Sequence, residues 1–512
     1  MVGKFEKSAF YYSAIIFIWT FITYLPVLNV GFLSDDFGFF PYFSLSMDEI
    51  KRAVELIRSG DQFLSPVRPG GMISFSIDYY LWGLDESKFH LTNIFLHSIN
   101  AVLIFTLLKR LGMKESSSAF AGLLFGLNPI NPEAVVWISG RFDVLALTWL
   151  LISMLLWISG WQNGRGIYLA FSAAAFLISV FSKETSVAGI LLFPLVDLFI
   201  FRISSSSDSI KRRFNGWGYI GLIAPIIATF ALRVWLYGEK AGYSEWDGFK
   251  SNSGMLAGKL LNTFFMNLWI LVSPINREIW VDVASPVKMI IVIIWLIFCV
   301  ATAAGLFTLL SDRSKENSGR KCIIWFGLIL MISTMLPTLP LNFVQESLRA
   351  SRYLYMPCAG ISISAAVSLL AILLKWKKSE ILYGAAAVVL IVSTFVLHSN
   401  NGAWIEAGRI ATDVHRKTEE QVSRITDGTR IVFINLPYVR KGAHLAPNAF
   451  DSYLYAMYGI ENVETKVIQI IPASIPFWWE GAIKSGDNYV VFVWDESEER
   501  IQIIEEFLRH KI

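Results

Sequence analysis

Apolar runs of about 20 residues, separated by short polar stretches, recur along most of the chain. A helix of that length can cross the hydrocarbon core of a bilayer, so each run predicts a membrane span. About eleven spans are predicted, over residues 9–30, 88–110, 116–131, 141–160, 166–183, 185–203, 217–237, 287–310, 322–341, 352–374 and 380–398. A further apolar helix, 255–273, ends at Pro274 and a polar turn, and we expect it to lie in the membrane interface without crossing. The pattern predicts an α-helical polytopic membrane protein.

Lysine and arginine alternate between the loops that join these spans. Short cytoplasmic loops accumulate both residues. With the N-terminus inside, the inner loops hold Lys4, Lys7, Lys109, Arg110, Lys114, Arg202, Lys211, Arg212, Arg213, Arg313, Lys315, Arg320, Lys321, Lys375, Lys377 and Lys378. The alternation therefore predicts a cytoplasmic N-terminus, a membrane domain over 1–398 and an extracytoplasmic domain over 399–512.

The first outer loop, 31–87, carries a helix-start signal at Ser46-Met47-Asp48-Glu49, a capping box. Apolar residues then recur at helical spacing until Gly60. We expect a short amphipathic helix here, which lies either on the membrane surface or against the outer loops of the protein itself.

The last segment, 399–512, is more polar and has a different pattern. Residues 430–434 and 489–493 have the unbroken apolar character of buried strands. Further elements are predicted as a helix near 449–459, a strand near 464–471 and an amphipathic helix at about 497–510. The aromatic run 475–480 fits either a core turn or a surface that stacks on sugars or headgroups. Together these elements predict a small α/β domain.

Composition supports a bilayer as the main solvent. Charged residues make up 17% of the chain and hydrophobic residues 54%, whereas a soluble domain carries roughly 25% charged residues. The net charge of +3 gives no indication of nucleic acid as a partner. The three cysteines lie in apolar runs without metal-ligand or disulfide spacing, which indicates small buried side chains.

The strongest candidate for chemistry is Asp35-Asp36, directly beyond the first span and flanked by aromatic residues. Two carboxylates at a membrane interface are costly to desolvate. Their mutual repulsion raises the pKa of one member, and such a group can take a proton from a hydroxyl. The alternative is a solvated loop start or an interfacial anchor.

Other ionisable residues fall at span ends on the same outer side. They are Arg68 before Pro69, Glu133, Arg141 and Asp143 around the fourth span, Lys183-Glu184 between the fifth and sixth, and Arg352-Tyr353 at the tenth. Structural alternatives exist, because Arg141 could extend to the interface and Lys183-Glu184 could form a self-neutralising turn. His90 and His97 share a helix face, where hydrogen bonds between helices are favoured over metal ligation.

Transfer of a sugar from a lipid phosphate needs such a set. One carboxylate takes the proton of the acceptor hydroxyl, and cations stabilise the departing phosphate. A glycosidase mechanism fits poorly, because it needs two separated carboxylates.

The ordered motifs resemble the GT-C superfamily of membrane glycosyltransferases, in particular the TMTC-type branch of protein O-mannosyltransferases. The matching stretches are the acidic pair, Arg68-Pro69, 89–100, Asn128-Pro129-Ile130-Asn131-Pro132-Glu133-Ala134-Val135, Ser139-Gly140-Arg141-Phe142-Asp143, Ser182-Lys183-Glu184-Thr185 and Ser351-Arg352-Tyr353-Leu354-Tyr355. The similarity covers most of residues 1–410.

The resemblance implies a polyprenyl-phosphate sugar donor, an inverting mechanism and an active site outside the cytoplasm. It assigns Asp35 as the catalytic carboxylate and Asp36 as its partner. Phosphate binding would fall to members of the set Arg68, Arg141, Lys183 and Arg352, supported by Glu133, Asp143, Glu184 and Tyr353. Two departures matter: Asn128 and Asn131 stand where TMTC relatives often have His, and the tetratricopeptide repeats are replaced by the α/β segment.

Two other functions fit less well. A metal-dependent oligosaccharyl transferase needs a further acidic cluster, and a lipid-linked-sugar flippase needs mid-membrane charges and related halves. We therefore predict no required cofactor, with a divalent metal not indicated. The expected partners are a polyprenyl-phosphate sugar donor, a protein, glycan or lipid acceptor, and the lipid bilayer.

Overall fold

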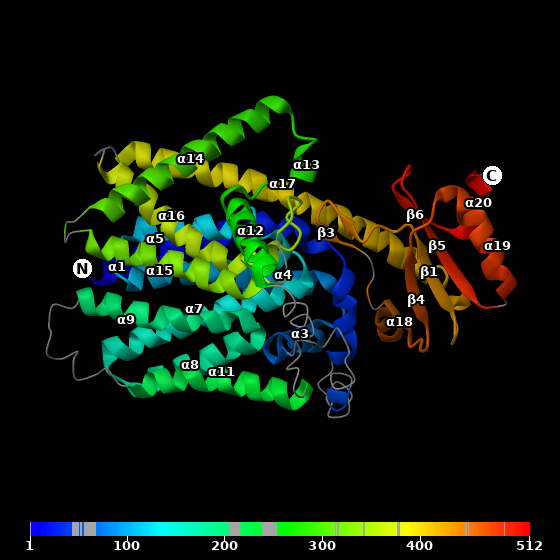
Figure 1. The fold of residues 1–512 in the computed structure, drawn as a ribbon, viewed down its shortest axis with the longest axis horizontal. Helices are drawn as coiled ribbons and strands as arrows, with labels where there is room; N and C mark the ends of the chain where they lie inside the picture. Colours follow the sequence, from blue (N-terminus) through cyan, green and yellow to red (C-terminus); the bar gives the residue numbers. More distant parts are fainter. Residues whose placement is uncertain are drawn as a thin grey trace.

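The computed structural model describes residues 2–43, 51, 54–55, 68–203, 216–237, 253–312, 314, 317–340, 344–375, 379–445, 448, 450–485 and 487–511. It consists of a large helical bundle and a small α/β domain at one end of that bundle (Figure 1). The predicted amphipathic helix at 46–60 lies almost entirely outside the described residues.

The helices of the bundle coincide with the predicted spans, except α12, which coincides with the apolar helix expected in the membrane interface. They are α1 (Val2–Tyr24), α4 (Glu86–Arg110), α5 (Glu115–Gly126), α7 (Arg141–Asn163), α8 (Gly166–Ser182), α9 (Leu192–Ile203), α11 (Gly216–Tyr237), α12 (Ser253–Val272), α14 (Ser285–Ser311), α15 (Ser318–Met335), α16 (Tyr355–Lys375) and α17 (Ser379–Glu419). Within the described ranges, eight helical segments are long and apolar enough to cross a membrane. The protein is an integral membrane protein, as predicted.

The bundle has an inner and an outer layer. The spans built on α7 and α16 are 72% and 83% buried, so they form its centre. In contrast, only 11% of the apolar window of α14 is buried, and Ile290, Leu296 and Phe307 are more than half exposed. Such side chains are stable on an outer helix when lipid covers them. Figure 1 shows α14 along one side of the bundle.

Two predicted spans have shorter helices than expected, since α5 and α9 have 12 residues each. α8, with 17 residues, ends one residue before its predicted bound at 183. A 3-10 helix, η4 (Glu184–Leu191), precedes α9. Because a 3-10 helix rises about 2 Å and an α-helix about 1.5 Å per residue, η4 and α9 together reach across a hydrocarbon core of about 30 Å.

The last helix of the bundle is longer than predicted. α17 is a continuous helix of 41 residues that passes the predicted boundary at 398 and ends at Glu419. Figure 1 shows it leaving the bundle and reaching the α/β domain. The side chain of Asn400 donates to the carbonyls of Pro129 and Pro274, at 2.7 and 3.0 Å, so it ties this helix to the end of the bundle.

Short elements at the same end of the bundle carry the polar residues of interest. They are η1 (Leu25–Asn29), η2 (Ser34–Tyr42), α3 (Pro69–Trp82), α6 (Pro132–Val135), η3 (Ile138–Gly140), α13 (Arg277–Trp280), η8 (Leu336–Thr338) and η9 (Ser351–Leu354).

The α/β domain is built on a four-stranded sheet in the order β4-β1-β5-β6. β1 (Arg430–Ile434) pairs in parallel with both β4 (Glu464–Ile468) and β5 (Tyr489–Asp495), and β6 (Arg500–Ile503) pairs antiparallel with β5. Helices α18 (Phe450–Tyr458), α19 (Ile475–Ser485) and α20 (Ile504–Lys511) complete the domain.

The small domain confirms the predicted fold class, with one correction. The segment predicted as a single helix over 497–510 begins as strand β6, and only its second half is helical. In β6 the buried residues Ile501, Gln502 and Ile503 pair with β5, so sheet pairing prevails over the local amphipathic pattern.

A hairpin formed by β2 (Val439–Arg440) and β3 (Ala443–His444) connects the domain to the bundle. Its turn contains Gly442 at φ +86°, where an added Cβ would lie 2.0 Å from the backbone oxygen of Ser347. Only glycine permits so close an approach. The hairpin therefore packs directly on the loop that precedes η9.

Candidate active site

A single stretch, residues 132–143, organises the polar end of the bundle. It comprises α6, η3 and the first turn of α7. The chain folds back closely here, since a Cβ on Gly140 would lie 2.4 Å from the carbonyl oxygen of Ala134. Glu133, Ser139, Arg141 and Asp143 project from this stretch, and each contacts a different part of the site.

Asp36 is anchored to this stretch and is only 2% exposed. Its carboxylate accepts hydrogen bonds from the backbone N–H groups of Leu33 and Ser139, both at 2.9 Å, and from the Ser139 hydroxyl. Burial raises the pKa of Asp36 from 3.8 to about 7, although these hydrogen bonds act in the opposite direction. Asp36 therefore fixes the start of η2 in place.

Asp35 occupies a different environment from its neighbour. It is half-buried, and its Oδ1 accepts a hydrogen bond of 2.9 Å from the side-chain amide of Asn448. The same amide donates to the hydroxyl of Ser34 at 3.1 Å, where Ser34 adopts a positive φ of 50°. The two carboxylates are thus unequal, with Asp36 held inside and Asp35 at the accessible position.

Arg141 is fully buried and already paired. Its guanidinium lies 2.5 Å from a carboxylate oxygen of Asp78 and donates to Asn93 Oδ1 at 2.6 Å and to the carbonyl of Phe89 at 2.7 Å. The ring of Phe75 lies 4.6 Å away on its face. These contacts favour a positioning role for Arg141, which holds α3, α4 and α7 together.

Lys183 also lies inside the protein, with 2% of its surface exposed. Its Nζ forms an ion pair with Asp143, and the ring of Tyr353 lies 4.8 Å away. Lys183 thus joins the end of α8 to the start of α7.

Arg68 and Glu184 form the most regular ion pair of the site. Two parallel hydrogen bonds of 3.0 and 2.8 Å connect the guanidinium to the two carboxylate oxygens. The Arg68 side chain remains 21% exposed, so it is accessible to a ligand.

Arg352 is the second accessible cation, with 22% of its side chain exposed. Its guanidinium lies 3.4 Å from Glu133, 4.4 Å from the ring of Trp137 and 5.2 Å from the ring of Tyr353. Glu133 is 1% exposed and also lies 3.5 Å from Nε2 of His444, which comes from the hairpin of the α/β domain. The ring of His444 stacks on Trp137 at 4.5 Å.

The structure therefore places every predicted site residue at one end of the bundle, at different depths. Arg141 and Lys183 are buried in ion pairs, whereas Arg68 and Arg352 are partly exposed. All four roles in phosphate binding stay predictions.

Four residues of the site were not predicted as such. Asp78 is a lone carboxylate in an apolar helix, and such a group needs a buried partner, so the sequence contained a signal for it. Ser139 lies within a motif that the sequence analysis quoted. His444 and Asn448 carried no signal, because only the folded α/β domain brings them to the acidic pair and to Glu133.

His90 and His97 form hydrogen bonds between helices and loops, the alternative that the sequence favoured over metal ligation. His97 makes hydrogen bonds of 2.8 Å with Tyr355 and 3.0 Å with the carbonyl of Gly126, and His90 contacts the carbonyl of Val30. In the described part of the chain, no group of three or more His, Cys, Asp or Glu side chains is arranged to hold a metal ion. Metal independence stays a prediction.

The pKa of Asp36 predicts a dependence of stability on pH. Between pH 3.8 and about 7 the folded protein retains a proton that the unfolded chain releases. The stabilising contribution of this proton is complete below pH 3.8 and is lost as the pH rises through about 7. We expect the unfolding temperature of the wild type to fall more steeply from pH 5 to pH 8 than that of Asp36→Asn. Parallel curves for the two proteins would contradict the assignment.

The amide of Asn448 predicts a contribution of the α/β domain to activity. Asn448→Ala removes the hydrogen bond that orients Asp35, and one bond to a charged group is worth about 1.5–3 kcal/mol. We expect at least a roughly tenfold loss of sugar transfer, measured with the assay described below. Asn488→Ala makes the same change elsewhere in the domain and should leave transfer unchanged. Equal rates for the two variants would show that Asn448 has no such role.

Comparison with known proteins confirms the resemblance to the TMTC-type branch. No family model matches the chain. Protein O-mannosyl-transferase TMTC2 of Homo sapiens is 24% identical over 420 residues, which covers 66% of this chain and 49% of that protein. TMTC4 of Homo sapiens is 22% identical over 384 residues, with coverage of 66% and 51%. The match to tmtc2 of Xenopus laevis, 27% identical over 222 residues, covers 40% and 27%. The chain thus matches about half or less of the length of these relatives.

Solved structures also match the chain at low sequence identity. The oligosaccharyltransferase AglB from Archaeoglobus fulgidus, in complex with an inhibitory peptide and a dolichol-phosphate, matches with a TM-score of 0.42 and 9% identity, covering 94% of this chain and 69% of that one. ArnT from Cupriavidus metallidurans bound to undecaprenyl phosphate matches with a TM-score of 0.38 and 12% identity, covering 95% and 93%. Both TM-scores are below 0.5.

Proposed function

We propose that the protein is a glycosyltransferase that moves a sugar from a polyprenyl-phosphate donor to an acceptor hydroxyl on the extracytoplasmic side of the membrane. The observation that carries the proposal is the arrangement around 132–143. This stretch contacts both the acidic pair, through Ser139, and the accessible cation Arg352, through Glu133. A base and a phosphate ligand are thereby held by one short piece of chain.

The reaction is a single displacement. Asp35 takes the proton of the acceptor hydroxyl while the acceptor oxygen attacks the anomeric carbon of the sugar. The bond between that carbon and the phosphate oxygen breaks, and the polyprenyl phosphate leaves with the electron pair. Attack opposite the leaving group inverts the configuration at the anomeric carbon.

The two partly exposed arginines, Arg68 and Arg352, supply the phosphate site. A guanidinium presents a planar fork of donors that matches phosphate oxygens. Arg352 and Arg68 each use part of that fork on a carboxylate and keep about a fifth of the side chain accessible. Lys183 and Arg141 are buried, and their charges are paired with Asp143 and Asp78.

The sequence relatives support this reaction class, since their names describe protein O-mannosyl-transferases. Mannose is therefore the first sugar to test. The acceptor is a separate question, because the match covers only about half of those relatives.

The decisive experiment is a transfer assay with the purified protein, a radiolabelled polyprenyl-phosphate mannose and membrane extract from the source cell. Transfer of label to a chloroform-insoluble product supports the proposal. The donor should be replaced in turn by glucose and galactose derivatives. The proposal fails if no polyprenyl-phosphate sugar is consumed while the protein is folded.

The same assay tests the role of Arg352. Arg352→Met keeps the length of the side chain but removes the charge, and we expect kcat/KM for the donor to fall roughly 10- to 100-fold. Arg416→Met is the matched control, because Arg416 is exposed and its described ion pairs are with Asp413 and Glu420, close to it in the sequence. A normal donor KM and kcat in Arg352→Met would exclude Arg352 from the phosphate site.

A further inference from the structure

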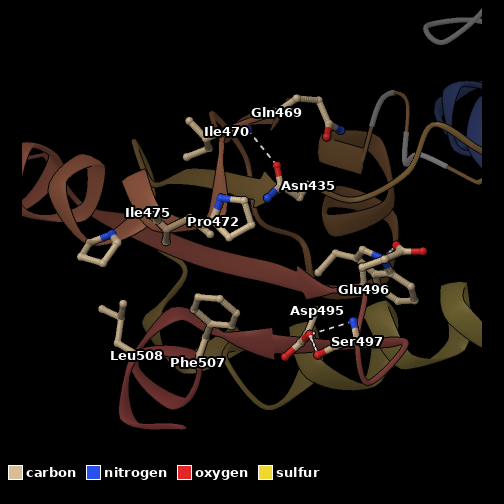
Figure 2. A pocket seen from close by; sticks show the side chains of 13 residues that line it. Asn435, Gln469, Ile470, Pro472, Ile475, Asp495, Glu496, Ser497, Phe507 and Leu508 are labelled. Carbon is tan, nitrogen blue, oxygen red and sulfur yellow. Dashed lines mark hydrogen bonds between the residues drawn. The ribbon is translucent and has the colours of Figure 1, made fainter. Parts of the chain in front are cut away.

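A pocket of about 720 Å³ lies at the carboxyl ends of the parallel strands in the α/β domain (Figure 2). It is lined by the residues that follow β1 and β4, by the end of β5 and by α20. From β1 the chain crosses to β4 on one side, and from β4 it crosses back to β5 on the other side of β1. Ligands of open α/β sheets bind at such a reversal of strand order.

The polar groups of the pocket are held in fixed positions. Asn435 accepts a hydrogen bond from the backbone N–H of Ile470 at 2.8 Å and adopts a positive φ of 59°. The amide of Gln469 donates to the carbonyl of Leu436 at 3.0 Å. Glu496 accepts from the indole N–H of Trp494 at 2.6 Å. Figure 2 shows these side chains around the same opening.

Apolar side chains lie between these polar groups. They are Ile470 and Pro472 beside Asn435, together with Ile475, Phe507 and Leu508. The described residues that line the pocket include Asp495 and Glu496 but no lysine or arginine. Arg440 at the rim is already paired with Glu496, Glu406 and Glu499, so a phosphate or another anion would meet Asp495 and Glu496 without a free cation among the residues that line the pocket.

We infer that this pocket binds a neutral oligosaccharide. Sugar hydroxyls both donate and accept, so they fit a site that mixes carboxylates, amides and the Ser497 hydroxyl. The C–H faces of a sugar ring bury apolar surface when they pack on side chains such as Ile470, Ile475 and Phe507. The size of the pocket falls in the range of small-molecule sites, about 300–1,000 Å³.

The pocket is connected to the candidate active site through the β2–β3 hairpin. Arg440 in β2 binds Glu496 at the pocket rim, at 3.0 Å, and Glu406 on α17, at 2.8 Å. Four residues later, His444 lies beside Glu133. The bound oligosaccharide is thus placed as the acceptor, an assignment that rests on the proposed function.

Binding is tested with the full-length protein in lipid nanodiscs, because maltoside detergents are themselves sugars. Saturation-transfer NMR with mannotetraose, glucotetraose and galactotetraose reports contact without any turnover. We expect a signal from at least one of them with the wild type. Ala473→Trp fills the pocket and should abolish the signal, and Gln469→Leu should weaken binding about tenfold. Lys466→Leu, in strand β4 just before Gln469 but not among the residues that line this pocket, should bind normally.

Several outcomes would overturn the inference. They are no signal from any of the three sugars, equal binding by the wild type and Ala473→Trp, or binding only of an uncharged Ser/Thr-rich peptide offered in parallel. The proposed function is judged separately. If the sugar binds but no donor is consumed, the function fails and the pocket stands. If transfer proceeds and the acceptor KM is unchanged in Ala473→Trp, the acceptor role fails and the function stands.

Discussion

Asp35→Asn should abolish most sugar transfer, with a loss of roughly 10²- to 10⁴-fold, the usual contribution of a positioned general base. The substitution keeps the size of the side chain and removes its ability to take a proton. Asp35 is half-buried, and its only described side-chain hydrogen bond is to an exposed amide, so little else in the fold depends on it. We expect the donor KM to stay within a few-fold of the wild type.

A matched control separates this effect from a general loss of carboxylate charge. Asp451→Asn changes an exposed carboxylate in α18 and should leave the rate unchanged. Rates are compared after the unfolding temperature of each variant has been measured. Undiminished transfer in Asp35→Asn would remove Asp35 from the mechanism.

Arg141→Met should cause the largest loss of stability, about 3–5 kcal/mol, because it leaves the buried carboxylate of Asp78 without its cation. That is a large fraction of the total stability of a folded protein. The denaturation midpoint in mixed SDS micelles measures the loss. Arg416→Met, at an exposed ion pair, should change the midpoint by less than about 1 kcal/mol.

A double variant makes the explanation specific. Asp78→Asn removes the unpaired charge but keeps an acceptor for the hydroxyl of Thr92, which lies 2.9 Å from Asp78. The combination with Arg141→Met should therefore recover most of the lost stability. If the double variant is no more stable than Arg141→Met alone, the ion pair does not explain the effect.

Much of the bundle could be predicted because a membrane span needs a continuous run of about 20 apolar residues, which is visible in the sequence. Every predicted span has a helix in the structure, strands β1 and β5 coincide with their apolar runs, and β4 begins at the predicted residue 464. The end of α17 could not be found in this way. Asn400, Asn401 and Gly402 are typical of a helix end, yet here Asn400 makes tertiary hydrogen bonds to Pro129 and Pro274. Strand β6 failed for the same reason, since its partner β5 determines its conformation.

The site shows the same division. The sequence predicted that repulsion would raise the pKa of one carboxylate of the pair. The pKa of Asp36 is raised, but burial is the main cause and the charge of Asp35 the smallest. Which cations remain accessible was not predictable. Arg141 is buried and forms an ion pair with Asp78, which lies 63 positions earlier in the sequence. His444 and Asn448 reach the site only through the docking of the hairpin, and no periodicity records such a contact.

The unbroken helix α17 has a mechanical consequence. Its 41 residues extend about 60 Å at 1.5 Å per residue, roughly twice the thickness of a hydrocarbon core. Because it is continuous from the bundle to the α/β domain, it fixes the distance of the sheet from the bundle. An oligosaccharide that binds the pocket of the α/β domain and reacts at Asp35 must be long and flexible enough to span this distance. The continuous helix would thus select acceptors by their length, before the transfer reaction begins.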